Sequence, residues 1–146
     1  MSQTSHNHRL LREGGLAFFG AITASLSHEI NNVLAIVGEL SGLLGDLTHG
    51  AAAGRPLDPE RLQSISGRVS DQVERGKRLV KRLNRFAHTV DQPFTEVSVN
   101  ETLELITTLC QRFAGLKKAS LSTDFPDDEL LIETSAFGLM QAVHLC

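Results

Sequence analysis

One histidine in this sequence stands close to a carboxylate and an amide at spacings that suit nucleophilic chemistry. The run Ser27-His28-Glu29-Ile30-Asn31-Asn32 lies inside a segment with helical periodicity. A neutral imidazole attacks best when its second ring nitrogen donates to a carboxylate, and Glu29 can supply one. Asn32, one helical turn further on, can orient a water or a phosphoryl oxygen. The run therefore favours attack by His28 on a phosphoryl group. An ordinary exposed histidine among polar neighbours fits the spacing equally well.

The helix that must carry these residues is predicted to run from about Leu16 to Leu47, a length of about 48 Å. Helices of this length with a single apolar stripe are typical of bundles and coiled coils. At about 100° per residue, His28 lies roughly 160° from Ile30, so we expect its ring to face solvent. The stripe recurs at steps of three and four residues and comprises Phe19, Ile22, Leu26, Ile30, Val33, Val37, Leu40, Leu44 and Leu47.

A second helix is predicted from Pro59 to about Ala87. The stretch Thr48 to Leu57 contains two glycines and a proline and is predicted to be a loop. Asp58 then suits the N-cap position, with Pro59 in the first turn and Glu60 close to the positive end of the helix dipole. Two long helices joined by a short loop predict an antiparallel helical hairpin.

The apolar stripe is broader than a single neighbouring helix can cover. Phe19, Leu26, Val33, Leu40 and Leu47 form one row, and a second row lies beside it. Leaving such residues half-exposed is costly, because burying one Leu or Ile contributes about 1.5 to 3 kcal/mol. Pairing two hairpins would cover both rows, so we expect a homodimer in the form of a four-helix bundle. The alternative is that the C-terminal segment covers the second row.

The chain after residue 91 has a different pattern, which predicts the opening of an α/β sandwich. Alternating residues predict a strand over 94–99, and Asn100 followed by Glu101 predicts a helix start. Two further strands are predicted over 119–125 and 130–132, with a turn at 126–128 between them. Ser135 suits the N-cap of a last helix. The fold class is therefore mainly α, with the hairpin followed by an incomplete α/β sandwich.

Composition narrows the class of protein. The chain has 146 residues, 41% of them hydrophobic, and a net charge of −3, which argues against general nucleic-acid binding. No apolar run approaches the roughly 18 residues of a membrane span, and residues 1–15 are predicted to be a polar tail without an export signal, so we expect a cytoplasmic protein.

Cys110 and Cys146 are expected to be buried, reduced thiols. His6 and His8 are too few for a metal site, so no metal is expected.

The second helix ends in a run of basic residues. If the helices turn as predicted, this end lies roughly level with His28, where it could attract a phosphate or an acidic partner. An ordinary solvated face, with cations favourable at a helix C-terminus, explains the same pattern. The residues are Arg75, Lys77, Arg78, Lys81, Arg82 and Arg85.

The run around His28 also resembles the phosphoacceptor box of sensor histidine kinases of two-component systems, which typically reads His-Glu-x-x-Asn or His-Glu-x-x-Thr. The hairpin and the strand-and-helix pattern after residue 93 are similar to that family in order and length. The resemblance covers about residues 16–146. It implies a dimerisation and phosphoacceptor domain over residues 16–90 and the first part of an ATP-binding domain over residues 91–146.

The resemblance further implies a role for each residue of the box. His28 would accept the γ-phosphoryl group of ATP and pass it to an aspartate on a response-regulator receiver domain. Glu29 would assist as a hydrogen-bonding base, and Asn32 would position a water for dephosphorylation of the partner. The parent protein would be a protein-histidine kinase that uses ATP and Mg2+, while this segment holds no cofactor itself.

Two departures from the family pattern leave alternatives open. Val33 follows Asn32 where many relatives carry proline, so the usual helix bend is not predicted. Leu145 stands where the family's ATP-binding asparagine is expected, so this chain alone should not bind ATP. An ATP-independent histidine phosphotransferase is therefore one alternative, and a structural helical dimerisation adaptor is the other.

Overall fold

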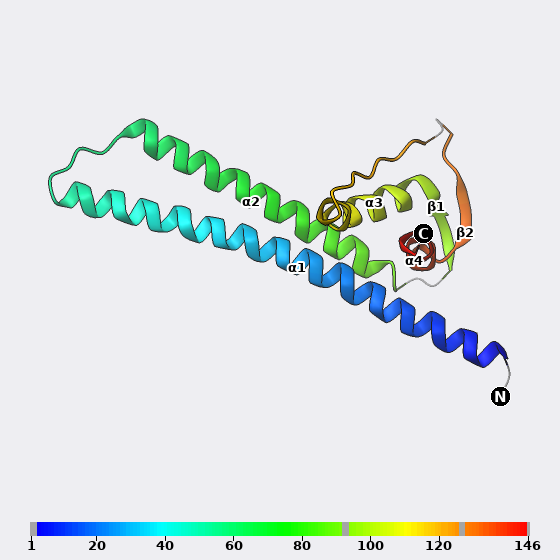
Figure 1. Ribbon diagram of the computed structural model, residues 1–146. Helices are drawn as coiled ribbons and strands as arrows, with labels where there is room; N and C mark the ends of the chain where they lie inside the picture. Colours follow the sequence, from blue (N-terminus) through cyan, green and yellow to red (C-terminus); the bar gives the residue numbers. More distant parts are fainter. Residues whose placement is uncertain (1–2, 92–93, 126–127, 146) are drawn as a thin grey trace. The chain divides into compact units, whose positions relative to one another are not determined.

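The chain is mainly helical, with a small antiparallel sheet. The computed structural model describes residues 3–91, 94–125 and 128–145, with side chains from Arg12 onward in these ranges. Over these ranges the elements are, in order, α1 (Gln3–Ala52), α2 (Pro59–His88), β1 (Thr95–Ser98), α3 (Val99–Leu116), β2 (Leu131–Thr134) and α4 (Ala136–His144) (Figure 1). The prediction of a mainly α chain is confirmed.

The described residues form two compact units. The central unit is Ser27–Lys81, and it contains the later part of α1 and most of α2. The terminal unit joins the chain up to Leu26 with the chain from Arg82 onward. In this division the ends of both long helices group with the C-terminal segment. The domain boundaries expected at residues 15 and 90 remain predictions.

In the central unit, α1 and α2 lie side by side and run in opposite directions (Figure 1). Val33, Leu40, Ile65 and Leu79 are buried, with at most 4% of each residue exposed. At Gly76, an added Cβ would lie 3.4 Å from Cγ1 of Val33, so a glycine permits close contact between the helices at this point. The apolar stripe of α1 therefore faces α2, as its spacing predicts.

The loop between the helices is shorter than predicted, but the start of α2 is where the sequence placed it. Backbone N–H groups of Glu60 and Arg61 donate to Oδ1 of Asp58 over 3.0 and 3.4 Å, which confirms Asp58 as the N-cap. α1 continues through Ala51 and Ala52, because alanine is the strongest helix former. Gly54 then adopts a φ of 84°, which the other residue types rarely tolerate, and the chain turns.

α1 also begins earlier than predicted, at Gln3, so the expected start near Leu16 is wrong. Residues 3–13 contain neither glycine nor proline, and nothing in that stretch ends a helix that has begun. Polarity alone predicts a tail over residues 1–15. Polar residues such as Arg and Glu have good helix propensity, however, and polarity does not exclude a helix.

The core of the terminal unit is built from aromatic and aliphatic side chains of four helices. Phe86 of α2 is fully buried and meets Phe18 of α1 edge to face, with ring centroids 5.6 Å apart. It also stacks on Phe19 at 5.3 Å. Ile106 of α3 and Met140 of α4 complete this core, and each is at most 1% exposed. The ends of the long helices are thus anchored to the C-terminal segment by an aromatic cluster.

The sheet of the terminal unit pairs β1 with β2, and Thr95 lies opposite Thr134. The strands predicted near 94–99 and 130–132 are therefore confirmed. Residues 119–125 form no strand, which corrects the third prediction. In that segment the carbonyl of Leu121 accepts a 2.7 Å hydrogen bond from Nε2 of Gln111, a side chain of α3. A strand needs a partner ladder, and this segment is held by a helix instead. The α/β sandwich beyond these two strands remains a prediction.

The caps of the two short helices follow local side chain chemistry. Ser135 caps α4 as predicted, since its Oγ accepts from the N–H of Gly138 at 3.1 Å. The predicted cap of α3 at Asn100 is wrong, because Ser98 takes that role and accepts from Glu101 N at 3.3 Å. Ser98 and Glu101 have the spacing of a capping box. Asp128 is the last residue of the turn predicted at 126–128, and the first two, 126 and 127, lie outside the described part of the chain.

One stretch of the described residues, Arg12–Ala52 of α1, is long and apolar enough by composition to cross a membrane. Its best window has a mean hydropathy of 1.2, and 11% of that window is buried. The criterion is weak, because core helices of soluble proteins and N-terminal signal sequences also meet it. The expectation of a chain without a membrane segment remains a prediction.

Replacing Phe86 with alanine should destabilise the terminal unit by about 3 to 5 kcal/mol, because it removes a fully buried ring and leaves a cavity. Phe94→Ala is the matched control, since Phe94 is 74% exposed and its ring leaves no cavity when removed. Urea unfolding of the three chains at one protein concentration measures the difference. Equal losses for both variants would contradict the core described above.

Candidate functional site

His28 lies on the surface of α1 in the central unit, with its ring in solvent. Two residues of the apolar stripe, Leu26 before His28 and Val33 after it in the sequence, are 3% and 4% exposed. The prediction that the imidazole points away from the apolar stripe is therefore confirmed. The helix is uninterrupted on either side of residue 28, and this continuity fixes the direction in which the ring projects. An incoming group can reach the ring without opening the core.

Asn32 is the residue that contacts the ring. Its amide nitrogen Nδ2 lies 3.2 Å from Nδ1 of His28, one turn along the same helix. The contact joins the amide of Asn32 to the imidazole, and the roles of donor and acceptor in it depend on the tautomer of the ring. The sequence predicted that Asn32 would share the patch with His28, and the two side chains are indeed together.

Glu29 faces a different neighbour. Its Oε2 lies 3.8 Å from Nη2 of Arg75 on α2, and the two side chains are 24% and 46% exposed. The pair belongs wholly to the central unit. At this distance and exposure the ion pair contributes only about 0 to 1 kcal/mol to stability. The carboxylate that could serve the imidazole is thus directed toward a guanidinium across the helix pair.

The basic residues of α2 differ in their partners. Nζ of Lys77 bonds Oε1 of Glu74 at 2.7 Å, and this contact lowers the pKa of the Glu74 carboxyl. In the terminal unit, Nη2 of Arg85 lies 2.6 Å from Oε2 of Glu101. These pairs partly neutralise the basic run. Arg75 is the member of the run that the structure brings to the His28 neighbourhood, through its contact with Glu29.

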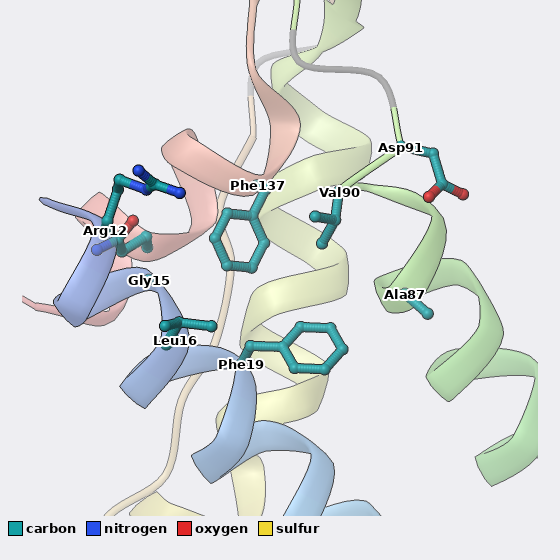
Figure 2. A pocket seen from close by; sticks show the side chains of 9 residues that line it. Arg12, Gly15, Leu16, Phe19, Ala87, Val90, Asp91 and Phe137 are labelled. Atoms are coloured by element: carbon teal, nitrogen blue, oxygen red, sulfur yellow. The ribbon is translucent and has the colours of Figure 1, made fainter.

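The terminal unit contains an apolar hollow of about 690 Å³ that sequence reasoning did not identify. Figure 2 shows the rings of Phe19 and Phe137 facing each other across it, with Leu16 beside Phe19. Arg12 and Asp91 lie at its margins on opposite sides (Figure 2). Such a space suits apolar groups, and its lining contains no nucleophile or acid–base pair that resembles the His28 site. It was not predictable because it needs the ends of three helices together.

A thiol and an imidazole meet elsewhere in the terminal unit. Sγ of Cys110 lies 3.5 Å from Nδ1 of His144, and both line a hollow of about 360 Å³. The His144 ring is 4.9 Å from the Phe18 ring and 6.0 Å from that of Phe113. Burial raises the pKa of the Cys110 thiol, which keeps it protonated. Cys110 is a free cysteine, as expected, but it is half-buried and not fully buried, and Cys146 lies outside the described residues.

No three His, Cys, Asp or Glu side chains come close enough to hold a metal ion anywhere in the part of the chain that the structure describes. The residues around His28 are a solvent-facing imidazole, an amide beside Nδ1, and a carboxylate paired with arginine.

A search of curated proteins finds a relative that is named as a sensor protein. The chain is 27% identical over 128 residues to a "Putative sensor protein" of Shewanella frigidimarina (strain NCIMB 400). The match covers 72% of this chain and 19% of that protein, so the chain spans about a fifth of the relative's length. No protein-family model matches the chain, and no solved structure matches it.

The Cys110 thiol should react with iodoacetamide more slowly in the folded chain than in urea, because its raised pKa leaves less thiolate at any given pH. The rate in the folded chain should begin to rise only at a pH above that at which the unfolded chain reacts. Cys146→Ser removes the second thiol from both measurements. Identical pH profiles with and without urea would contradict the assigned burial.

Proposed function

We propose that this chain is the phosphate-accepting and dimerising part of a sensor histidine kinase, with His28 as the acceptor. The observation that carries the proposal is a solvent-exposed imidazole on an uninterrupted helix, with the amide of Asn32 3.2 Å from its Nδ1. The resemblance of residues 27–32 to the family's phosphoacceptor box supports it. A relative named as a sensor protein supports a sensory role for the whole protein.

In the proposed reaction, a ring nitrogen of His28 attacks the γ-phosphorus of ATP. A nitrogen–phosphorus bond forms, the bond to the leaving oxygen of ADP breaks, and the leaving oxygen keeps the electron pair. The phosphoryl group then passes to an aspartate of a response-regulator receiver domain. Such transfers depend mainly on positioning and on stabilisation of charge. Glu29 serves as the hydrogen-bonding base, and Asn32 positions a water when the partner is dephosphorylated.

The ATP and Mg2+ of this reaction belong to a catalytic domain. Residues 91–146 supply its first elements in the proposed protein, and Leu145, at the end of α4, occupies the position expected for an ATP-binding asparagine. Leucine offers neither a metal ligand nor a hydrogen bond to a nucleotide. In the proposed protein, His28 therefore accepts a phosphoryl group only when a competent catalytic domain is supplied.

Leu145 also favours a second candidate, a histidine phosphotransferase that relays phosphate without using ATP. Both candidates assign His28 the same acceptor chemistry. They differ in the donor, which is ATP in the first and another phosphoprotein in the second. Phosphorylation by a phosphorylated receiver domain, in the absence of ATP, would favour the second candidate.

Dimer formation is supported by apolar residues of the central unit that no other part of that unit covers. Leu34 of α1 is 62% exposed, and Val73 and Val80 of α2 are 43% and 45% exposed. Ile30 and Val37 of α1 beside them are only half-buried. Helical geometry places these residues on one side of the antiparallel pair, and His28 about 120° from Leu34 on α1. A second copy on that side would leave the acceptor accessible.

Histidine 28 should be the site of label incorporation when the chain is mixed with a competent kinase domain and labelled ATP. The phosphoryl group should be acid-labile and base-stable, as a nitrogen–phosphorus bond is. His28→Gln should abolish labelling, while His49→Gln should retain it, since His49 is another exposed histidine of α1. Label that survives His28→Gln would overturn the assignment.

Val73→Glu should shift the chain from dimer to monomer, because it places a charge on the exposed apolar side, where burial without a partner is costly. Ser64→Glu is the matched control, since nine residues earlier on the same helix is about half a turn away, and Ser64 is exposed. Light scattering at micromolar concentration measures the mass. A measured mass of 15.9 kDa for the wild-type chain, which is the mass of one monomer, would contradict the dimer.

A further inference from the structure

The apolar hollow of about 690 Å³ in the terminal unit has no part in the chemistry proposed for His28. Its described lining lies wholly within the terminal unit. We propose that this hollow binds a small amphipathic acid, an aliphatic carboxylate of medium chain length. The chain of the ligand lies against the apolar walls, and its carboxylate lies at Arg12. This binding is independent of phosphate acceptance in the central unit.

The walls of the hollow are apolar and only partly covered by protein. Figure 2 shows Phe19 and Phe137 on opposite sides of it, with Leu16 and Val90 beside them. Leu16 is 75% exposed and Val90 is 50% exposed. Apolar hollows of roughly 300 to 1,000 Å³ with a few polar groups are typical sites for small molecules. A chain lying against these walls would remove exposed apolar surface from water, which is favourable.

The orientation of the two rings favours a flexible chain over a flat aromatic ligand. The ring centroids of Phe19 and Phe137 are 6.5 Å apart, and the ring planes are tilted by 50°. A flat ring held between them would need parallel walls at least about 7 Å apart, because carbon atoms in contact are about 3.5 to 4.0 Å apart. An unbranched chain can instead bend along an irregular wall, as methionine side chains do in protein cores.

The charges at the margins favour an anionic head group. The exposed guanidinium of Arg12 extends from α1 toward Phe137 (Figure 2). Among the described residues, no carboxylate pairs with it. Asp91 lies at the opposite margin, but its carboxylate points away from the hollow, and its Oδ2 is 2.9 Å from Nδ1 of His88. Arg12 can therefore bind the ligand carboxylate, whose two oxygens match the fork of a guanidinium.

Isothermal titration calorimetry of the full chain with dodecanoate, below its micelle-forming concentration, measures this binding. We expect one site per chain and much weaker binding of dodecyltrimethylammonium, which has the same chain and the opposite charge. The affinity for dodecanoate should fall as the salt concentration rises, because the contact with Arg12 is exposed to solvent. Equal affinities for the two ligands would overturn the assignment of the charge.

Two variants test the walls and the head-group contact separately. Leu16→Ala should weaken dodecanoate binding by at least about fourfold, the factor that one buried methylene group is worth. Leu116→Ala is its matched control, since Leu116 of α3 is 73% exposed and is not among the described residues that line the hollow.

Arg12→Gln should weaken dodecanoate binding by about two- to fivefold, the factor of an exposed ion pair. It should not weaken binding of dodecyltrimethylammonium. Arg68→Gln makes the same change of charge at an exposed residue of α2 in the central unit, and it should bind dodecanoate as the wild-type chain does. Equal losses in Arg12→Gln and Arg68→Gln would overturn the head-group contact.

The remaining outcomes decide whether the hollow is the site. Equal losses in Leu16→Ala and Leu116→Ala, or several equivalent sites per chain, would show that dodecanoate adsorbs to exposed apolar surface in general. A lower mass of Leu16→Ala in light scattering would show that a second copy of the chain occupies the hollow. Either result overturns the inference. His28→Gln should bind dodecanoate with wild-type affinity, so failure of the proposed function leaves this site unaffected.

Discussion

The geometry of this protein depends on the continuity of α1, which runs without a break from Gln3 to Ala52. In an unbroken helix each residue projects about 100° from the one before it. Packing of Val33 and Leu40 on α2 therefore also determines where His28 points. The apolar stripe supplies the free energy, and the helix converts that burial into the orientation of a polar side chain on the opposite surface. A kink near residue 28 would uncouple the two.

The electrostatics of the site come from the neighbouring helix as much as from α1. Glu29 is adjacent to His28 in sequence, yet its carboxylate is attracted to Arg75. Asn32 is four residues away and reaches the ring because i and i+4 side chains meet on a helix surface. These contacts are partly or fully exposed, so each contributes little free energy to stability.

The terminal unit shows how the long helices are joined to the rest of the chain. Phe18 and Phe86 belong to different helices, and Arg112 of α3 donates to the carbonyl of Ser25 at 3.1 Å. The ends of α1 and α2 share a core with α3 and α4, and so they are parts of one packed unit. A substitution in that core would therefore alter the packing of the ends of α1 and α2.

The sequence by itself determined the features that depend on local chemistry. Asp58 and Ser135 cap their helices as expected, because a cap needs only a side chain oxygen and the N–H groups two or three residues later. The stripe of α1 and the outward direction of His28 followed from helical periodicity. The choice between Ser98 and Asn100 as a cap was local too, and the capping-box spacing of Ser98 and Glu101 was the signal that decided it.

Only the tertiary structure decided the rest, because it depends on which distant groups meet. Residues 119–125 have strand-like composition but no partner strand, and Gln111 of α3 holds their backbone. The pairing of Glu29 with Arg75 requires the relative rotation of two helices, which periodicity within each helix does not contain. The grouping of Phe18 with Phe86 and Phe137 likewise joins residues far apart in the chain. Periodicity specifies which face of each element is buried, while packing specifies what that face is buried against.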